Sequence, residues 1–201
     1  MIPDNKASVG IYSTAISLGE AILLFSASVA AVLMSKVSNE KLIEVSRKQT
    51  MRLSKLSLGV TIPGILLFAL LPPDFYSWML GKDFSGVHSS FLTIAPGIIL
   101  VSFGTVFGHY FSGSGKHYMN FFSGLFGLSI TMFTVRQMIN VNGVEGAGWS
   151  ASLAYGGMAL FIFAAFMVTG RNNSGEWKEL LPNKSDFTAL KNIFQSSKQD
   201  Q

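Results

Sequence analysis

Glu20 is the residue whose type and position most clearly suggest chemistry, because it lies within an otherwise apolar stretch near the N-terminus. On a helix that rises about 1.5 Å per residue, Glu20 lies about 18 Å from Ser8, close to the middle of a lipid bilayer. A carboxylate at that depth costs several kcal/mol unless it faces protein or water, so it is a candidate ion-coupling or proton-relay group. The alternative is a protonated Glu20 that hydrogen-bonds to a neighbouring helix and serves assembly alone.

Four serines extend the polar surface of the helix that would carry Glu20. On a wheel of about 100° per residue, Ser13, Ser17, Ser28 and Ser35 lie within about 80° of Glu20. The predicted helix therefore has one polar stripe along its length. We select Glu20, Ser13 and Ser17 as the candidates for a transport or ion-coupling site.

His109, Lys116 and Arg136 are weaker candidates for the same role. His109 could titrate near neutral pH, although a lone histidine beside Tyr110 also fits an anchor at the membrane surface. Arg136 could contact a phosphate, or it could extend its charged end to the membrane interface. Lys116 stands in the short turn before a predicted helix.

The sequence has no pattern typical of an enzyme or a metal centre. It contains no Cys, and neither paired carboxylates nor a Ser-His-Asp set occurs at a recognised spacing. The run from Gly113 to Lys116 resembles the end of a phosphate-binding loop, but His117 stands where such a loop needs Ser or Thr, and no strand precedes it. We predict no catalytic residue, no cofactor, no metal and no nucleic-acid partner.

The elements that position these groups are long apolar stretches. Charged residues make up 13% of the chain, about half of the roughly 25% usual for globular proteins, and the mean hydropathy is +0.41. A helix needs about 20 mostly apolar residues to cross a bilayer, and the sequence lacks the alternating pattern of a membrane β-strand. We predict an all-α, polytopic membrane bundle over residues 1–170 and a cytoplasmic tail over 171–201. The five expected helices cover residues 12–34, 53–71, 88–111, 118–138 and 146–169.

Residues inside these stretches predict how the helices pack. Pro63 and Pro96 each remove a helical hydrogen bond, so we expect kinks or loosened turns there. The fourth helix has a small and polar stripe that either admits another helix or faces a wet cavity, formed by Asn120, Gly124, Gly127, Thr131 and Thr134. The fifth has a comparable contact face, formed by Gly146, Ser150, Ala154 and Gly157. Tyr76, Trp78 and Trp149 lie at predicted outer boundaries, as an aromatic belt requires.

The distribution of basic residues predicts the orientation of the bundle. Short cytoplasmic loops are enriched in Lys and Arg. Twelve basic residues fall on one predicted side: Lys36, Lys41, Arg47, Lys48, Arg52 and Lys55 in the loop after the first helix, Lys116, and Arg171, Lys178, Lys184, Lys191 and Lys198 in the tail. Lys6, Lys82 and Arg136 fall on the other. We therefore expect the N-terminus outside and the C-terminus in the cytoplasm.

Four short motifs occur in order at the ends of the predicted helices. They are Val9-Gly10-Ile11-Tyr12-Ser13-Thr14-Ala15 continuing to Gly19-Glu20-Ala21, then Gly81-Lys82-Asp83-Phe84, then Gly113-Ser114-Gly115-Lys116 with Asn120, and Gly143-Val144-Glu145-Gly146-Ala147-Gly148. In this order they resemble polysaccharide flippases, the Wzx-type O-antigen branch of the multidrug/oligosaccharidyl-lipid/polysaccharide exporter superfamily. The resemblance covers residues 6–170. Ser35 departs from it, because relatives often carry Pro near that position.

The resemblance implies a transporter of twelve helices in two lobes around a central cavity, in which this chain would supply helices eight to twelve of the C-terminal lobe. It implies translocation of an undecaprenyl-diphosphate-linked oligosaccharide across the inner membrane for polysaccharide biosynthesis, with membrane lipid and a missing N-terminal lobe as partners. Glu20 would then be an ion-coupling group or a glycan contact. Cations for the diphosphate would come from the absent lobe or from Lys55, Lys116 and Arg136.

Two other functions remain open from the residues. A drug/cation antiporter of the same superfamily should carry further buried acids, whereas Glu20 alone lies deep in an expected helix. A membrane assembly subunit that transports nothing is the other alternative. A membrane glycosyltransferase is disfavoured, because the sequence has no acidic nucleotide-sugar motif.

Overall fold

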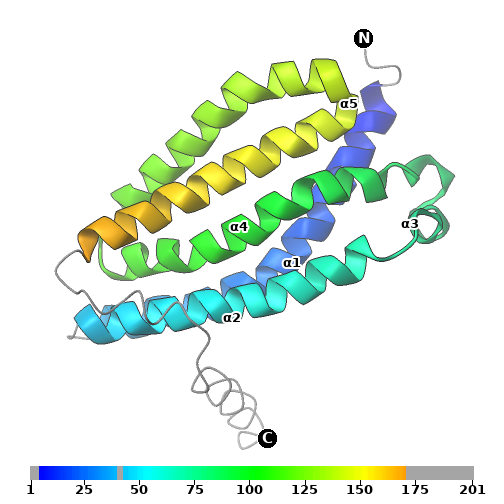
Figure 1. Ribbon diagram of the computed structural model, residues 1–201. Helices are drawn as coiled ribbons and strands as arrows, with labels where there is room; N and C mark the ends of the chain where they lie inside the picture. Colours follow the sequence, from blue (N-terminus) through cyan, green and yellow to red (C-terminus); the bar gives the residue numbers. More distant parts are fainter. Residues whose placement is uncertain (1–4, 40–42, 171–201) are drawn as a thin grey trace, which may run out of the picture.

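The computed structural model describes residues 5–39 and 43–170, and all regular structure in these two ranges is helical. The helices are α1 (Asn5–Asn39), α2 (Ile43–Ala69), α3 (Pro73–Leu80), α4 (Val87–Gly113) and α5 (Tyr118–Thr169), with a 3-10 turn η1 (Lys82–Phe84) before α4 (Figure 1). Three segments are long and apolar enough to cross a membrane, namely Val45–Ala69, Val87–Gly113 and Tyr118–Thr169, and Ser8–Leu24 is a shorter apolar segment. The predicted tail over 171–201 lies outside the described residues.

The long helix α5 consists of two segments that meet at Gly143. Gly143 has φ 57° and ψ −130°, in the left-handed region that glycine adopts without a steric penalty. The first half of α5 (residues 118–142) and the second half (144–169) run side by side in opposite directions (Figure 1). Any side chain at Gly146 would overlap the carbonyl of Met138. The reversal lies between the predicted fourth and fifth helices.

Helix α4 is the centre of the bundle and contacts α1, α2 and α5. One apolar cluster joins α4 to α1, α2 and α3 and includes Ile22, Ile65 and Phe91. A second joins it to α2 and the second half of α5 and includes Phe107 and Phe166. Lipid is as apolar as these side chains, so their contribution in a membrane is close van der Waals packing rather than removal from water.

Small residues bring α4 and the second half of α5 into close contact. A Cβ atom added to Gly104 would lie 2.9 Å from the Cα atom of Ala159, and one added to Gly148 would overlap the hydroxyl of Thr93. Larger residues at these glycines would separate the two helices. This seam therefore follows the general pattern of small residues at membrane helix interfaces.

Ser152 compensates for the proline inside α4. Its hydroxyl donates to the carbonyl of Thr93 at 2.6 Å and accepts from the backbone N–H of Gly97 at 3.1 Å. A regular helix would pair these two backbone groups with each other. Helices α2 and α4 are continuous through Pro63 and Pro96, and at Pro96 the neighbouring helix supplies the polar partner, as membrane helices require.

The predicted small stripes of the fourth and fifth helices pack against neighbouring helices rather than lining an open channel. Asn120 donates to the carbonyl of Gly108 at 3.0 Å, and the hydroxyls of Thr134 and Ser150 share a hydrogen bond of 2.8 Å. Gly127 lies against Met158, and Gly157 lies against Ile130. Gly124 is an exception, because a Cβ atom there would meet no neighbour.

The burial of Tyr76 contradicts its predicted place in an aromatic belt. Trp78 is 81% exposed and Trp149 is 43% exposed, but the side chain of Tyr76 is fully buried. Its hydroxyl donates to the carbonyl of Phe68 at 2.6 Å, and burial raises the pKa of that hydroxyl. The belt prediction is wrong for Tyr76, because its ring packs into one apolar core cluster with Phe91 and Val87 of α4.

The segment around Arg47, which was predicted to be a loop after the first helix, is helical in the structure. Helix α2 begins at Ile43, so Arg47, Lys48, Arg52 and Lys55 lie on a helix. The side chain of Arg47 is buried, its guanidinium donates to the carbonyl of Phe166 at 2.8 Å, and it stacks 3.9 Å from the centre of the Phe166 ring. A cation at this position complements the negative C-terminal end of α5 and ties it to α2.

Candidate functional site

Helix α1 has one packed face and one exposed face, and its polar residues lie on the exposed face. Ala15, Gly19 and Ile22 are buried, whereas Ser13, Ser17, Glu20 and Ser28 are exposed. Gly19 sets this rotation, because any side chain there would overlap the tip of Ile98 on α4. The side chain of Ser35, the fifth predicted member of the stripe, lies outside the described residues.

The carboxylate of Glu20 is available to a ligand from outside the bundle. Glu20 is exposed, and no hydrogen bond joins it to another residue that the structure describes. The hydroxyls of Ser13 and Ser28 donate to the carbonyls of Val9 and Leu24 in their own helix, at 2.6 and 2.8 Å. They keep their lone pairs, so this face presents acceptor oxygens. The alternative role of Glu20 in assembly requires a hydrogen bond to a neighbouring helix, and the described part of the chain provides no such partner.

Tyr155 is a member of this region that the sequence did not reveal. It lies in the second half of α5 and is half-buried, within electrostatic range of Glu20. Tyr12, two helical turns before Glu20, is also half-buried and within range of Tyr155. Helices α1 and α5 touch each other. The signal in the sequence that could have drawn attention to Tyr155 is its phenol group, which lies midway along the apolar stretch 146–169.

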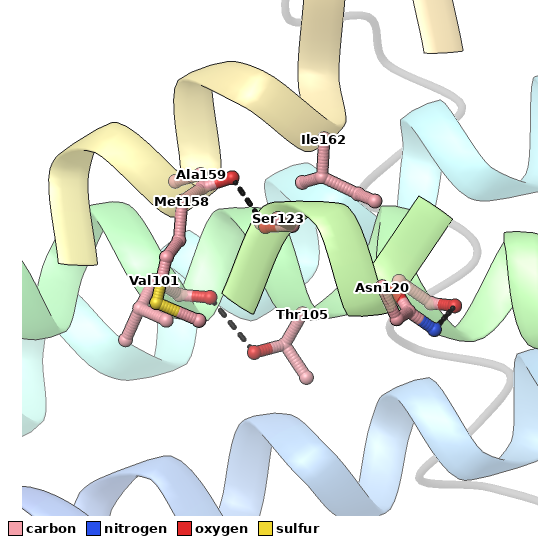
Figure 2. Close-up of a pocket in the computed structure, with 9 residues that line it drawn as sticks. Val101, Thr105, Asn120, Ser123, Met158, Ala159 and Ile162 are labelled. Atoms are coloured by element: carbon pink, nitrogen blue, oxygen red, sulfur yellow. Dashed lines mark hydrogen bonds between the residues drawn. The ribbon is translucent and has the colours of Figure 1, made fainter. Parts of the chain in front are cut away.

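A small cavity lies between α4 and the two halves of α5. Its volume is about 150 Å³, and Figure 2 shows the side chains around it. It is lined by Val101, Gly104, Thr105, Gly108, Asn120, Ser123, Met158, Ala159 and Ile162. Ser123 donates to the carbonyl of Met158 at 3.0 Å and Thr105 to that of Val101 at 2.8 Å. Because these donors have backbone partners, the cavity wall is mostly apolar.

The three weaker candidates are not brought to Glu20. His109 lies near the end of α4 and Lys116 lies in the following turn, whereas Arg136 lies near the opposite end of the first half of α5. In the ranges 5–39 and 43–170, no salt bridge or hydrogen bond joins any of them to Glu20. In the same ranges, no three His, Cys, Asp or Glu side chains lie together as metal ligands would.

Neither protein families nor curated proteins nor solved structures match this chain. The site therefore has to be interpreted from its own chemistry. It consists of the carboxylate of Glu20 and the serine hydroxyls on the exposed face of α1. Such a surface can bind a proton, a cation or hydroxyl groups.

Proposed function

We propose that this chain is one lobe of a membrane transporter and that the exposed face of α1 lines its transport pathway. The observation that carries this proposal is the exposure of Glu20 on an otherwise apolar bundle. A carboxylate that faced hydrocarbon in mid-membrane would be costly, so this face requires water or protein. A pathway completed by a second lobe supplies both.

The proposed transporter crosses the inner membrane with five helices of this chain. These are α1, α2, α4 and the two halves of α5, with the N-terminus outside and the C-terminus in the cytoplasm. Support comes from the reversal of α5 at Gly143 and from the unequal distribution of basic residues in the sequence. In this arrangement α3 and η1 lie at the outer surface.

The proposed substrate is an oligosaccharide linked to undecaprenyl diphosphate, which would make the chain part of a flippase rather than an enzyme. The four sequence motifs support this assignment. Rocking of two lobes would let a polar head group pass while its lipid tail stays in hydrocarbon. A drug/cation antiporter is less well supported, because the acids Asp74, Asp83 and Glu145 lie in or next to turns, and all three are exposed.

Exchange of Glu20 tests the function. Cells that lack this chain would receive the unmodified chain, E20Q, or E145Q as a matched change of an exposed acid. With E20Q, we expect export of the lipid-linked oligosaccharide to stop and the substrate to accumulate on the cytoplasmic leaflet, because Gln cannot exchange a proton. E145Q should export normally. Normal export with E20Q, with an unchanged response to the proton or sodium gradient, would remove Glu20 from the mechanism. Ethidium efflux in the same cells would instead favour the antiporter.

A further inference from the structure

The polar side chains around the cavity between α4 and the two halves of α5 have no hydrogen-bond donor to spare. They belong to Thr105, Asn120 and Ser123 (Figure 2). Thr105 and Ser123 donate to backbone carbonyls, and the amide of Asn120 donates to the carbonyl of Gly108 and the hydroxyl of Ser112 at 3.0 and 2.8 Å. The other wall residues are glycines or apolar. Because a buried water needs two to four polar partners, the cavity suits an apolar occupant better than water.

The cavity is closed at the seam between α4 and the second half of α5 and opens along another face of α4. At the seam, Gly104 and Ala159 are buried, and a Cβ atom added to Gly104 would lie 2.9 Å from the Cα atom of Ala159. Val101, Thr105 and Gly108 also line the cavity, but they are partly exposed. Their spacing of four and three residues places them on one face of α4. The mouth of the cavity therefore lies along this face.

The opening exists because the first half of α5 leaves α4 soon after the turn that joins them. Asn120 holds the two helices together by its hydrogen bonds to α4. Ser123 then donates to the carbonyl of Met158, and Gly127 lies against Met158, so the first half of α5 follows the second half. Gly124 lies one turn beyond Asn120, and a Cβ atom there would meet no atom within 4 Å. Open space therefore continues along the helix surface from the cavity wall at Asn120.

The depth and the size of the cavity fit a hydrocarbon chain. Gly104 and Gly108 precede the end of α4 at Gly113 by nine and five residues, which is about 14 and about 8 Å along a helix. Half of the hydrocarbon core of a bilayer is about 15 Å thick, and α4 is long and apolar enough to cross a membrane. An apolar protein cavity of about 150 Å³ can take up benzene. The cavity of about 150 Å³ therefore has room for several methylene groups at a depth where lipid chains lie.

We propose that this cavity is a lipid site, in which the free end of one acyl chain of a membrane lipid enters through the mouth on α4. The exposed side chains next to Gly124 on the first half of α5 support a lipid as the source, because Phe121, Leu125 and Leu128 are large and apolar and need no partner in hydrocarbon. The bound chain would fill space that no side chain fills and would link α4 to the first half of α5. This site is separate from the exposed face of α1. It requires only that α4 and α5 cross a membrane.

Photo-crosslinking of a lipid to the full chain in nanodiscs tests the site. The probe is a phosphatidylcholine with a diazirine near the free end of one acyl chain, and fragment mass spectra locate each adduct. Ala159 and Ile162 are each 3% exposed and line the cavity, whereas Ala154, 5% exposed on the same helix, is not part of its wall. We expect adducts on Ala159 and Ile162 and few on Ala154, because surrounding lipid reaches only exposed side chains. Leu128, 56% exposed, measures labelling by that surrounding lipid.

Two matched variants separate the cavity from the lipid-exposed surface. V101F narrows the mouth and should reduce the adducts on Ala159 and Ile162 by about tenfold, which corresponds to about 1.4 kcal/mol of binding. V168F makes the same change at a side chain that is 72% exposed and should leave these adducts unchanged. Adducts on Leu128 should be equal in all three chains.

The outcomes decide the lipid site without deciding the proposed transport. Labelling of Ala159 and Ile162 no stronger than that of Ala154 overturns the site, as does undiminished labelling in V101F or an equal loss in V168F. If V101F does not fold, as judged by helical circular dichroism and gel filtration, T105F narrows the same mouth and takes its place. Neither result changes the expected effect of E20Q on export, because Glu20 is not part of the cavity wall.

Discussion

The exposed face of α1 carries a carboxylate and several hydroxyls, whereas the exposed face of the first half of α5 is mainly large and apolar. Both belong to apolar helices at the outside of the bundle. The face of α1 presents Ser13, Ser17, Glu20 and Ser28, with the apolar Val9 and Leu24 among them. The face of α5 presents large apolar side chains, formed by Phe121, Phe122, Leu125, Phe126, Leu128, Met132 and Phe133.

This difference indicates two different surroundings. The apolar side chains of α5 need no partner in hydrocarbon, whereas a carboxylate and a row of hydroxyls in lipid would be costly. The first half of α5 is therefore the side that suits lipid, and α1 is the side that suits water or a further protein lobe. Burial within the bundle does not explain the contrast, because both faces are exposed.

Of the changes that test the difference between the two faces, a lysine introduced on each face should have the largest effect. Leu128 is 56% exposed near the middle of the first half of α5, and a Lys at the centre of a lipid-facing helix costs about 3 kcal/mol on insertion scales. S17K places the same charge on the polar face and should cost less than about 1 kcal/mol. We expect L128K, but not S17K, to reduce the fraction of chain that resists carbonate extraction from membranes. Equal loss for both variants would contradict two distinct surroundings.

Single cysteines should report the same difference without adding charge. The chain has no Cys of its own, so S17C and S28C can be compared directly with L128C and M132C. Thiol reagents react with the thiolate, which forms in water and not in hydrocarbon. We expect a membrane-impermeant thiosulfonate to label the two α1 positions and to spare the two α5 positions in intact vesicles. Labelling of L128C at the rate of S17C would refute the assignment of a lipid-facing side.

Removal of a buried serine hydroxyl should have a smaller effect, but still a larger one than removal of a serine hydroxyl on the exposed face. Removal of the Ser152 hydroxyl leaves the N–H of Gly97 and the carbonyl of Thr93 without their shared partner, which should cost about 1–3 kcal/mol of unfolding free energy in detergent. S17A, on the exposed face, should change it by less than about 0.5 kcal/mol.

Pro96 supplies the control for this prediction. If Ser152 matters because of the proline, P96A should reduce the cost of S152A, because a regular helix would then pair Gly97 with Thr93. Denaturation of all four chains, namely unmodified, S152A, P96A and the double variant, measures this coupling. An unchanged cost in the P96A background would show that Ser152 acts through helix contact alone.

Some features of the site could be predicted from the sequence, and others could not. The polar stripe of α1 follows from local spacing, because residues three and four apart share one face of any helix. The electrostatic effect of Glu20 on Tyr155 depends on which face of α5 meets α1, and local spacing does not contain that information. Tyr76 and Arg47 were misplaced for the same reason. The type of each residue suggested the membrane surface, whereas folding of α3 and α2 against the core buries them.

The sequence by itself determined the apolar helical segments, the break between the fourth and fifth expected helices and the mid-helix position of Glu20. These follow from the length of helix that a bilayer requires and from its demand that every backbone group be paired. Only the tertiary structure decided that Glu20 faces outward and that Ser152 serves the backbone at Pro96. These depend on how each helix is rotated in the bundle, and close contacts between distant residues, such as Gly19 with Ile98, set that rotation.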